Sequence, residues 1–195
     1  MAGSTRLTGK NHDHAMRLLA DVCGALDEAG VKYCLDAGTL LGVVRENRLL
    51  PWDNDLDLAV SRVELPNLDG PIEALRNKGY RVRVLNHTRE DPPMLLSEVR
   101  IVKVSVRRFY VFRGVQLDIF IKTKTEDVYT WAEGIRRYAR KSVPARFHDE
   151  LKQIEFAGRS YPIPADTDGY LTCRYGDWRT PQQDWDHIHD DKSLA

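Results

Sequence analysis

Three aspartates occupy alternate positions of one short segment, Asp53, Asp55 and Asp57 in "LLPWDNDLDLAV", residues 49–60. In a strand, Asp55 and Asp57 point to one side and the apolar residues between and after them point to the other. Two close carboxylates repel each other unless a cation or strong hydrogen-bond donors stabilise their charged forms. Oxygen ligands of this kind suit Mg²⁺ or Mn²⁺, which paired carboxylates commonly hold together with substrate phosphates. The segment therefore predicts a metal site for a phosphorylated substrate.

The same spacing fits two other interpretations. The three aspartates match positions one, three and five of a calcium-binding EF-hand loop, and Glu64 falls at position twelve. Leu58 stands where that loop needs glycine, and the alternation is that of a strand, so calcium is disfavoured. Aspartates also gather at turns and solvated strand ends. On this segment alone, the metal site and the surface cluster both stay open.

A second segment supplies a further carboxylate. Asp118 is the only charged residue of the apolar run "VQLDIFI", residues 115–121. If this strand lies beside residues 55–60 in a sheet, Asp118 completes a three-carboxylate site for one or two metal ions. It could instead serve as the general base that takes a proton from an attacking hydroxyl, and the sequence leaves both roles open.

The residues before the aspartates suit phosphate. In "DAGTLLGVVRENRLLPW", Gly38 and Thr39 follow a short strand and open a helix, so backbone N–H groups and a hydroxyl can face an anion. Arg45 lies two turns into that helix, and its planar guanidinium suits bidentate phosphate contact, although a surface arginine is the ordinary alternative.

Several other polar and aromatic residues allow more than one interpretation. Trp52 could stack on a base or face a quaternary ammonium, or be part of the core. Lys103 and Arg100 could neutralise a diphosphate if their faces of the strand point to the site, although charged residues on an exposed strand are the commoner case. Paired histidines lie in polar terminal stretches and receive no role: His12, His14, His187 and His189.

The pattern of the whole chain indicates a single α+β domain of mixed strands flanked by helices. Helices are expected at 12–29, from about 37 to 47, and at 69–78, and strands at 31–35, 55–60, 80–86, 97–106, 108–113 and 115–121. Residues 126–152 look helical with a break at Pro144, 153–164 look like a hairpin around Gly158, and a capped helix ends at Gly176. We expect one domain over 1–195, with a core at about 12–125 and a helical and hairpin portion at about 126–185.

Composition narrows the class of protein. The 29 basic and 29 acidic residues give a formal charge of zero, so a nucleic-acid partner is not expected. The three cysteines are far apart and odd in number, which favours buried thiols over disulfides. The first residues lack an apolar signal region, and nowhere do 18 apolar residues run together. The sequence therefore predicts a cytoplasmic protein without a membrane segment, and leaves its oligomeric state unknown.

These motifs resemble the LicD and fukutin family of phosphotransferases. The resemblance is carried by "LDAGTLLGVVRENRLLPWDNDLDLAV", by "LDIF" and by "IPADTDGYLTCRYGDW", in that order along the chain. It implies a nucleotidyltransferase-like fold. The chain departs from the family at Asn54, where an aspartate is common. Carried over by residue, it implies a metal pair in Asp55 and Asp57 and a third carboxylate in Asp118.

The resemblance also implies a reaction, which is transfer of a phospho-alcohol, such as phosphocholine or a pentitol phosphate, from a CDP-linked donor to a glycan or related hydroxyl, with release of CMP. Gly38, Thr39 and Arg45 would lie against the donor phosphates, with Tyr175 and Trp178 closing the far side of the pocket. Asp53, Trp52 and Lys103 complete the expected substrate-binding set. Two alternatives remain: a nucleotidyltransferase that attacks the α-phosphate of a nucleoside triphosphate, and a catalytically silent nucleotide-binding or metal-binding module.

Overall fold

The computed structural model of this 195-residue chain describes residues 6–106, 114–134, 138–182, 185–186 and 188–193. In chain order the elements are α1 (Lys10–Glu28), β1 (Tyr33–Leu35), α2 (Ala37–Glu46), β2 (Asp55–Ser61), the 3₁₀ helix η1 (Arg62–Asn67), α3 (Asp69–Asn77), β3 (Arg81–Asn86), β4 (Val99–Ser105), β5 (Gln116–Thr125), β6 (Val128–Glu133), β7 (Ala139–Pro144), α4 (Arg146–Asp149), β8 (Leu151–Phe156), β9 (Arg159–Pro164) and α5 (Thr167–Tyr175).

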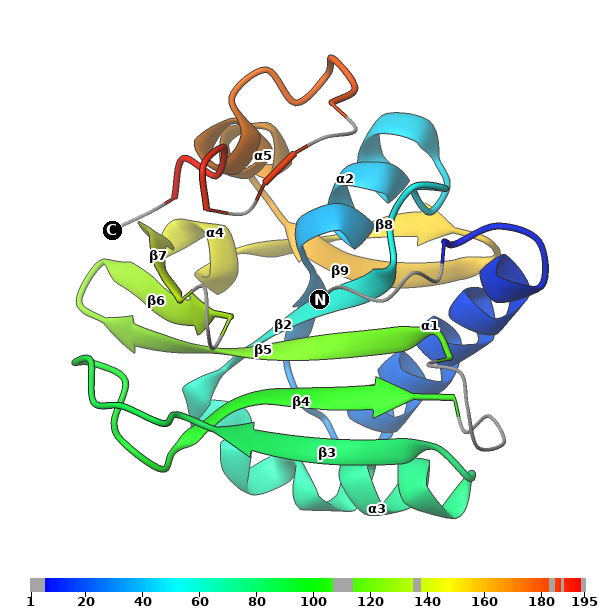
Figure 1. Cartoon of the computed structure of the whole chain (residues 1–195), viewed down its shortest axis with the longest axis horizontal. Helices are drawn as coiled ribbons and strands as arrows, with labels where there is room; N and C mark the ends of the chain where they lie inside the picture. Colours follow the sequence, from blue (N-terminus) through cyan, green and yellow to red (C-terminus); the bar gives the residue numbers. More distant parts are fainter. Residues whose placement is uncertain (1–5, 107–113, 135–137, 183–184, 187, 194–195) are drawn as a thin grey trace.

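A mixed sheet organises these elements (Figure 1). Its strands run in the order β1-β2-β5-β4-β3, with β6 added to the end of β5 and β7 added to β6. The central pair, β2 and β5, is parallel, and the other pairs are antiparallel. The β8–β9 hairpin forms a separate two-stranded sheet. The parallel pair matters most for function, because it places the two acidic strands side by side.

Helices cover the sheet unequally. In Figure 1, α1 and α3 lie behind the sheet, while the face of β5, β4 and β3 that is turned to the viewer has no helix in front of it. The apolar sides of β2, β4 and β5 pack toward α1 and α3, and Leu56, Val104 and Leu117 are fully buried there. The predicted fold class, a mixed sheet flanked by helices in one domain, is confirmed.

Local signals in the sequence placed several element ends correctly. Gly30 adopts a left-handed conformation (φ 67°) just after α1, as its position predicted. The hairpin turn at Ala157 and Gly158 also has two positive φ angles, 49° and 77°, and joins β8 to β9. The side chain of Asp166 accepts a hydrogen bond from the backbone N–H of Gly169 at 2.9 Å and so caps α5.

The helix predicted across residues 126–152 is wrong. This segment forms β6 and β7, followed by the four-residue helix α4. Residues 128–131, "VYTW", are β-branched or aromatic, and three of them become buried when β6 joins the sheet. Pro144 ends β7 and does not interrupt a helix. The strand expected at 108–113 lies outside the described residues.

Two further expectations can be compared with the structure. All three cysteines are free thiols, and Cys23 and Cys34 are buried. No helix in the described ranges is both long and apolar enough to cross a bilayer.

Candidate active site

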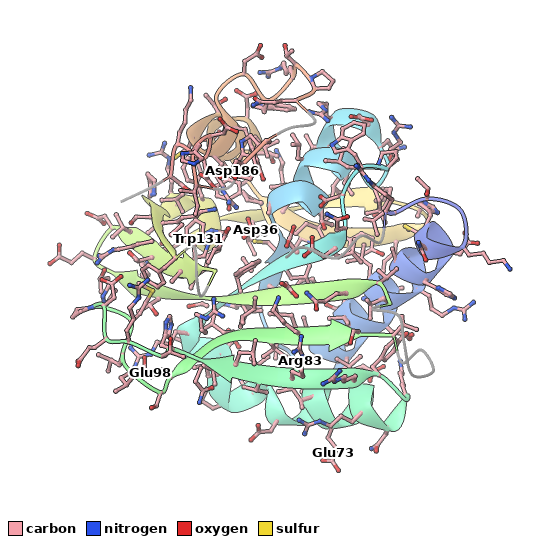
Figure 2. All side chains as sticks on the ribbon, in the orientation of Figure 1. Asp36, Glu73, Arg83, Glu98, Trp131 and Asp186 are labelled. Atoms are coloured by element: carbon pink, nitrogen blue, oxygen red, sulfur yellow. The ribbon has the colours of Figure 1, made fainter. Side chains whose placement is uncertain are left out.

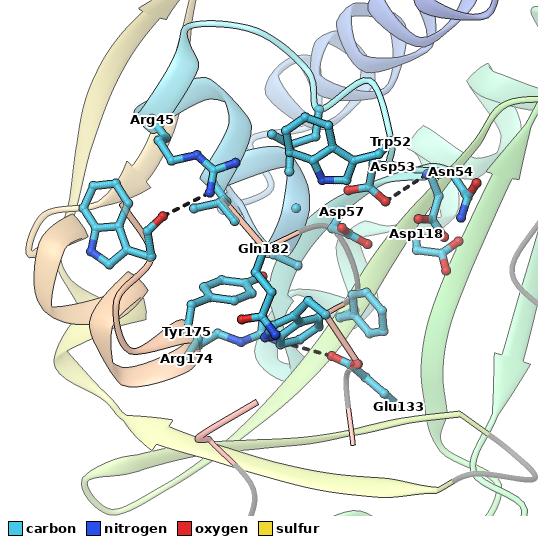
Figure 3. A pocket seen from close by; sticks show the side chains of 18 of the residues that line it. Arg45, Trp52, Asp53, Asn54, Asp57, Asp118, Glu133, Arg174, Tyr175 and Gln182 are labelled. Atoms are coloured by element: carbon cyan, nitrogen blue, oxygen red, sulfur yellow. Dashed lines mark hydrogen bonds and ion pairs between the residues drawn. The ribbon is translucent and has the colours of Figure 1, made fainter. Parts of the chain in front are cut away.

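The predicted acidic face exists and is built by strand register. In the parallel β2–β5 pair, Asp57 lies opposite Asp118 and Asp55 lies opposite Gln116. Opposed residues in a sheet point to the same face, so Asp55, Asp57 and Asp118 share one side. Figure 3 shows Asp57 and Asp118 near one another, with Asp53 approaching from the loop before β2. The pairing expected between residues 55–60 and 115–121 is therefore confirmed.

These carboxylates line a cavity of about 370 Å³. The N-terminal part of α2 and the loop before β2 form one wall, and α5 with the segment after it forms the other (Figure 3). The described lining residues are Ala37, Gly38, Leu41, Arg45, Leu50, Trp52, Asp53, Asn54, Asp55, Asp57, Asp118, Phe120, Glu133, Arg174, Tyr175, Asp177, Trp178, Thr180, Gln182 and Trp185. The cavity thus gathers most of the residues that the sequence singled out.

The carboxylates are crowded and poorly compensated. Burial raises the pKa of Asp55 to about 8, with Asp118 and Asp53 adding to the effect. Burial followed by the charge of Asp55 raises the pKa of Asp57 well above its ordinary value. The pKa of Asp53 is also raised by burial. Four carboxylates facing one cavity, Asp57 and Asp118 buried and Asp53 and Asp55 partly buried, indicate that a cation belongs beside them.

Asp118 differs from its neighbours because it has protein partners. Lys103 lies opposite it on β4, and the Lys103 ammonium contacts Asp118 Oδ2. The Gln116 side-chain amide donates to Asp118 Oδ1 at 2.7 Å. Burial raises the pKa of Asp118, and Lys103 opposes that rise. Lys103 therefore lies on the same face as the carboxylates and contacts Asp118, but it is not among the described residues that line the cavity.

The first turn of α2 approaches the carboxylates closely. A Cβ added to Gly38 would lie 2.0 Å from Asp53 Oδ2 and in ordinary contact, 3.8 Å, with Asp57 Oδ2, so a side chain here would displace the Asp53 carboxylate from its present position. The preceding residue, Ala37, is held in the left-handed region (φ 43°), a strained conformation of the kind found at functional sites. The first N–H groups of a helix lack acceptors within the helix. Because Ala37 and Gly38 line the cavity, this turn can meet an anion there.

Thr39 has a different place from the one predicted. Its hydroxyl oxygen accepts a hydrogen bond from the Asp57 backbone N–H at 2.9 Å, and its side chain is buried. Thr39 is not among the residues that line the cavity. It fixes α2 against β2 and thereby positions Asp57.

Arg45 lies on the cavity wall with its guanidinium already bonded. Nη1 donates to the Trp178 carbonyl at 3.0 Å, and Nε and Nη2 donate to Glu46 Oε1 at 3.1 and 2.7 Å. Its guanidinium carbon lies 6.0 Å from the centre of the Trp52 ring, which also lines the cavity. Arg45 therefore joins α2 to the segment after α5, and any phosphate contact would add to that role.

Replacing Arg45 with lysine should weaken this connection. A lysine keeps the charge but cannot donate to Trp178 and Glu46 at once, because it lacks the planar fork. We expect turnover to fall by about tenfold, with a change in the free energy of unfolding of about 1 kcal/mol. Steady-state kinetics and thermal unfolding measure both. Replacement of the exposed Arg76 by lysine is the matched control, and wild-type kinetics in Arg45→Lys would remove Arg45 from the site.

The segment around α5 closes the far side of the cavity, as the family resemblance implied for Tyr175 and Trp178. Both residues line it, and Trp178 and Tyr175 are largely buried. Sequence reasoning missed Glu133 and Arg174, which line the same wall. Glu133 was missed because its strand was read as helix. The run of β-branched and aromatic residues in "VYTW" was the available signal.

Other candidates lie elsewhere. Arg100 is buried and donates to the Gly134 carbonyl at 3.2 Å. His12 pairs with Asp13 on α1 at 3.7 Å. Neither of these, nor His14 or His189, lines the cavity, and His187 lies outside the described residues.

The donor chemistry fits a hard divalent cation. All the crowded ligands are carboxylate oxygens, which Mg²⁺ and Mn²⁺ prefer. Among the described residues, no three histidine, cysteine or carboxylate side chains are grouped as ready-made ligands of one ion. Magnesium commonly takes only one or two carboxylates and completes its shell with water and substrate phosphates. The fit is therefore to an ion that binds together with a phosphorylated substrate.

Comparisons with known proteins agree with this geometry. Residues 30–166 match the family model described as "LicD/FKTN/FKRP, nucleotidyltransferase domain". The uncharacterized protein RP689 of Rickettsia prowazekii (strain Madrid E) is 26% identical over 180 residues, which cover 89% of this chain and 58% of that protein. The human ribitol-5-phosphate transferase FKTN is 26% identical over 177 residues, covering 88% of this chain and 34% of that protein.

The chain spans about half the length of the first two Rickettsia relatives it matches, 58% and 49%. Among solved structures, that of ANT(2'')-Ia in complex with adenylyl-2''-tobramycin aligns with a TM-score of 0.44 at 17% identity, covering 87% of this chain and 80% of the other. The family match covers the first turn of α2, the acidic strand β2 and Asp118 on β5. This chain belongs to the LicD/FKTN/FKRP family.

Proposed function

We propose that this domain transfers a phospho-alcohol from a CDP-linked donor to a hydroxyl of a glycan or related acceptor, and releases CMP. The observation that carries the proposal is the register pairing of Asp57 with Asp118 beside the first turn of α2, in a cavity within the family's nucleotidyltransferase domain. The relatives FKTN and FKRP, named as ribitol 5-phosphate transferases, support a phospho-alcohol as the transferred group.

The proposed cofactor is Mg²⁺ or Mn²⁺, held by Asp55, Asp57 and Asp118. When bound, it would supply positive charge that offsets the charge developing on the departing phosphate and makes the acceptor hydroxyl more acidic. The chain's own residues do the positioning. Gly38 leaves room for the carboxylates, Thr39 fixes the backbone of Asp57, and the first turn of α2 receives a donor phosphate oxygen.

Asp118 is the proposed general base as well as a ligand. Lys103 and Gln116 each contact one of its oxygens and orient it. A carboxylate has about four acceptor positions, so each oxygen keeps capacity for a further partner. The nearby ammonium favours the ionised form that a base requires.

The far wall suits the nucleotide or the carried alcohol. Trp52, Tyr175 and Trp178 give it aromatic faces, on which a base can stack or against which a cationic alcohol can rest. Only two cations, Arg45 and Arg174, line the described part of the cavity. Arg174 is itself paired with buried carboxylates, and so small a cationic charge suits the two phosphates of a CDP-alcohol better than a triphosphate.

Product identity tests the reaction. In the proposed transfer, the acceptor hydroxyl attacks the phosphorus that bears the alcohol, the bond from that phosphorus to the CMP oxygen breaks, and the hydroxyl proton passes to Asp118. With magnesium, CDP-choline, CDP-ribitol or CDP-glycerol should therefore yield CMP and no pyrophosphate, detected by chromatography. Release of pyrophosphate from a nucleoside triphosphate, with every CDP-alcohol left unused, would contradict the proposal and favour nucleotidyl transfer.

A further inference from the structure

A cationic shelf extends the acidic face of the sheet. The row that contains Asp57 and Asp118 continues through Lys103 on β4 to Arg83 on β3, because Asp118 pairs with Lys103 and Lys103 pairs with Arg83. The adjoining row runs from Asp55 through Gln116 and Ser105 to Arg81. Residues within a row point to the same face. One face of the sheet therefore carries carboxylates on β2 and β5 and cations on β4 and β3.

This shelf, defined by Arg81, Arg83 and Lys103, is open to solvent. Arg81 and Arg83 are exposed, and Lys103 keeps 20% of its side-chain surface exposed. Figure 2 labels Arg83 on β3, on the part of the sheet that Figure 1 shows without a covering helix. In the described part of the chain, neither Arg81 nor Arg83 makes a side-chain hydrogen bond or an ion pair.

Charged residues on an edge strand can simply prevent strand-to-strand aggregation. Protection against aggregation does not require that all the charges have the same sign. Nor does it require that they lie in the same rows as the carboxylates of β2 and β5. Here all charged side chains on this half of the face are cationic, although the whole chain has no net charge. The residues on the opposite side of β3 and β4 include the buried Val82, Val102 and Val104. The arginines are thus placed on the same side as the catalytic carboxylates.

We propose that the shelf binds an anionic group of the acceptor, so that the acceptor is a saccharide or polyol bearing phosphate or carboxylate. This inference rests on the proposed function for the identity of the acceptor, while the anion site itself does not. Adjacent strands lie about 4.8 Å apart, so Arg83 lies about 10 Å from Asp118 across β4. An acceptor whose charged group sits about one sugar ring or more from the reacting hydroxyl can reach both. Guanidinium groups suit phosphate and carboxylate alike.

Binding to the complete chain tests the shelf without any need for turnover. The probes are a trimer of phosphodiester-linked glycerol, trigalacturonate and neutral maltotriose, titrated by calorimetry at low and moderate salt. We expect at least one anionic probe to bind, more weakly as salt rises, and maltotriose not to bind. The first two probes separate a phosphate ligand from a carboxylate ligand. Equal affinity for maltotriose would overturn the anionic assignment.

Variants locate the site. The double change Arg81→Gln and Arg83→Gln should weaken the favoured anionic probe at least tenfold and leave the unfolding temperature unchanged. The matched control, Arg76→Gln with Lys152→Gln, removes the same charge from exposed positions on α3 and β8 and should bind as wild type. Equally weakened affinity for the anionic probe in both double variants would show nonspecific charge attraction and overturn the shelf. Wild-type affinity in the Arg81→Gln, Arg83→Gln variant would overturn it as well.

Turnover adds a second measurement. With a CDP-alcohol that the protein turns over, the KM for an anionic acceptor should be about tenfold higher in the Arg81→Gln, Arg83→Gln double variant than in wild type. The kcat and the KM for the donor should stay unchanged. The single variant Arg83→Lys, which keeps the charge, should bind the anionic acceptor more tightly than the double variant and less tightly than wild type. If no donor yields CMP but the binding results hold, the proposed function fails and the anion site stands. If CMP is released and the variants have no effect, the shelf alone fails.

Discussion

Replacing Asp57 with asparagine is expected to lower magnesium-dependent turnover by about a thousandfold or more, while the ligand-free protein keeps its fold. Asparagine has nearly the same shape but loses the charge that a divalent cation requires. The backbone N–H of Asp57 still donates to Thr39, so β2 stays in place. Donor binding measured by calorimetry should lose its magnesium dependence together with turnover.

The same change should stabilise the protein without ligands. A carboxyl whose pKa is raised in the folded state loses stability as pH rises from the unfolded pKa of about 4 toward the folded value. For Asp55 that folded pKa is about 8, so at pH 8 we expect Asp55→Asn to gain about 1–2 kcal/mol in free energy of unfolding. Asp57, whose pKa is also raised, should behave in the same way.

An exposed aspartate provides the comparison. Asp127→Asn removes the same charge in the turn between β5 and β6, outside the cavity, and should change neither turnover nor stability appreciably. Magnesium should raise the unfolding temperature of wild type at pH 8 in the presence of CDP, and should not do so for Asp55→Asn or Asp57→Asn. Unfolded variants would show a structural role for these aspartates, and full activity in both would remove the metal site.

The central part of this site could be predicted because strand alternation is a short-range property. The spacing of Asp55 and Asp57 determines that they share a face, and the apolar run around Asp118 marks a buried strand. The prediction that Asp118 lies beside Asp55 and Asp57 needed one assumption, that the two strands are neighbours. The parallel pairing of β2 with β5 confirms this assumption. Gly38 was singled out for its backbone, and the position of the Asp53 carboxylate, which a Cβ at residue 38 would meet, shows that the absence of a side chain matters as well.

What could not be predicted depends on pairings across long stretches of chain. Glu133 and Arg174 are 41 residues apart, and they contact each other only because β6 joins the sheet and α5 folds back over it. The sequence of β6 and β7 was ambiguous between helix and strand, and tertiary packing decided the outcome. Thr39 shows the reverse difficulty. Its hydroxyl was suited to phosphate, but Thr39 is buried outside the cavity lining, where its oxygen accepts from the Asp57 N–H.

Arg174 lies at the centre of a buried ionic network behind the cavity, the residues of which sequence reasoning did not find. It is 1% exposed. Its Nη1 lies 3.4 Å from Asp36 Oδ1, and its Nη2 lies 2.6 Å from Asp191 Oδ2 and 3.5 Å from Glu133 Oε1. The network joins the residue before α2, strand β6, helix α5 and the C-terminal segment (Figure 2 labels Asp36). Opening it would disturb both walls of the cavity.

Two lysines balance the remaining charges of the network. Lys122 Nζ lies 2.7 Å from Asp36 Oδ2, and Lys141 Nζ lies 2.7 Å from both Glu133 Oε2 and Asp191 Oδ2. With Arg174 present, three cations therefore face three carboxylates. Burial alone would raise the pKa of Asp36, but Lys122 and Arg174 together hold it well below its ordinary value. Loss of Arg174 leaves three carboxylates with two lysines, and so a net negative charge in the buried network.

Arg174→Met is therefore expected to lower the free energy of unfolding by about 3–5 kcal/mol at neutral pH. For a domain of this size, the unfolding temperature should fall by about 6–20 °C. Activity should fall as well, because Arg174 lines the cavity and α5 carries Tyr175. Scanning calorimetry and turnover below the unfolding temperature measure the two effects separately.

A second substitution separates charge imbalance from lost packing. Asp191→Asn in the Arg174→Met background leaves two carboxylates, Asp36 and Glu133, for two lysines, so the double variant should be less destabilised than the sum of the single variants. Additive losses would assign the effect of Arg174 to packing. An Arg174→Met protein that unfolds within about 1 °C of wild type would show that methionine replaces the ion pairs fully. The deficit of Arg174→Met should also shrink below about pH 4, because protonation of Asp36 and Asp191, whose pKa values are lowered in the folded wild type, removes the unpaired charge.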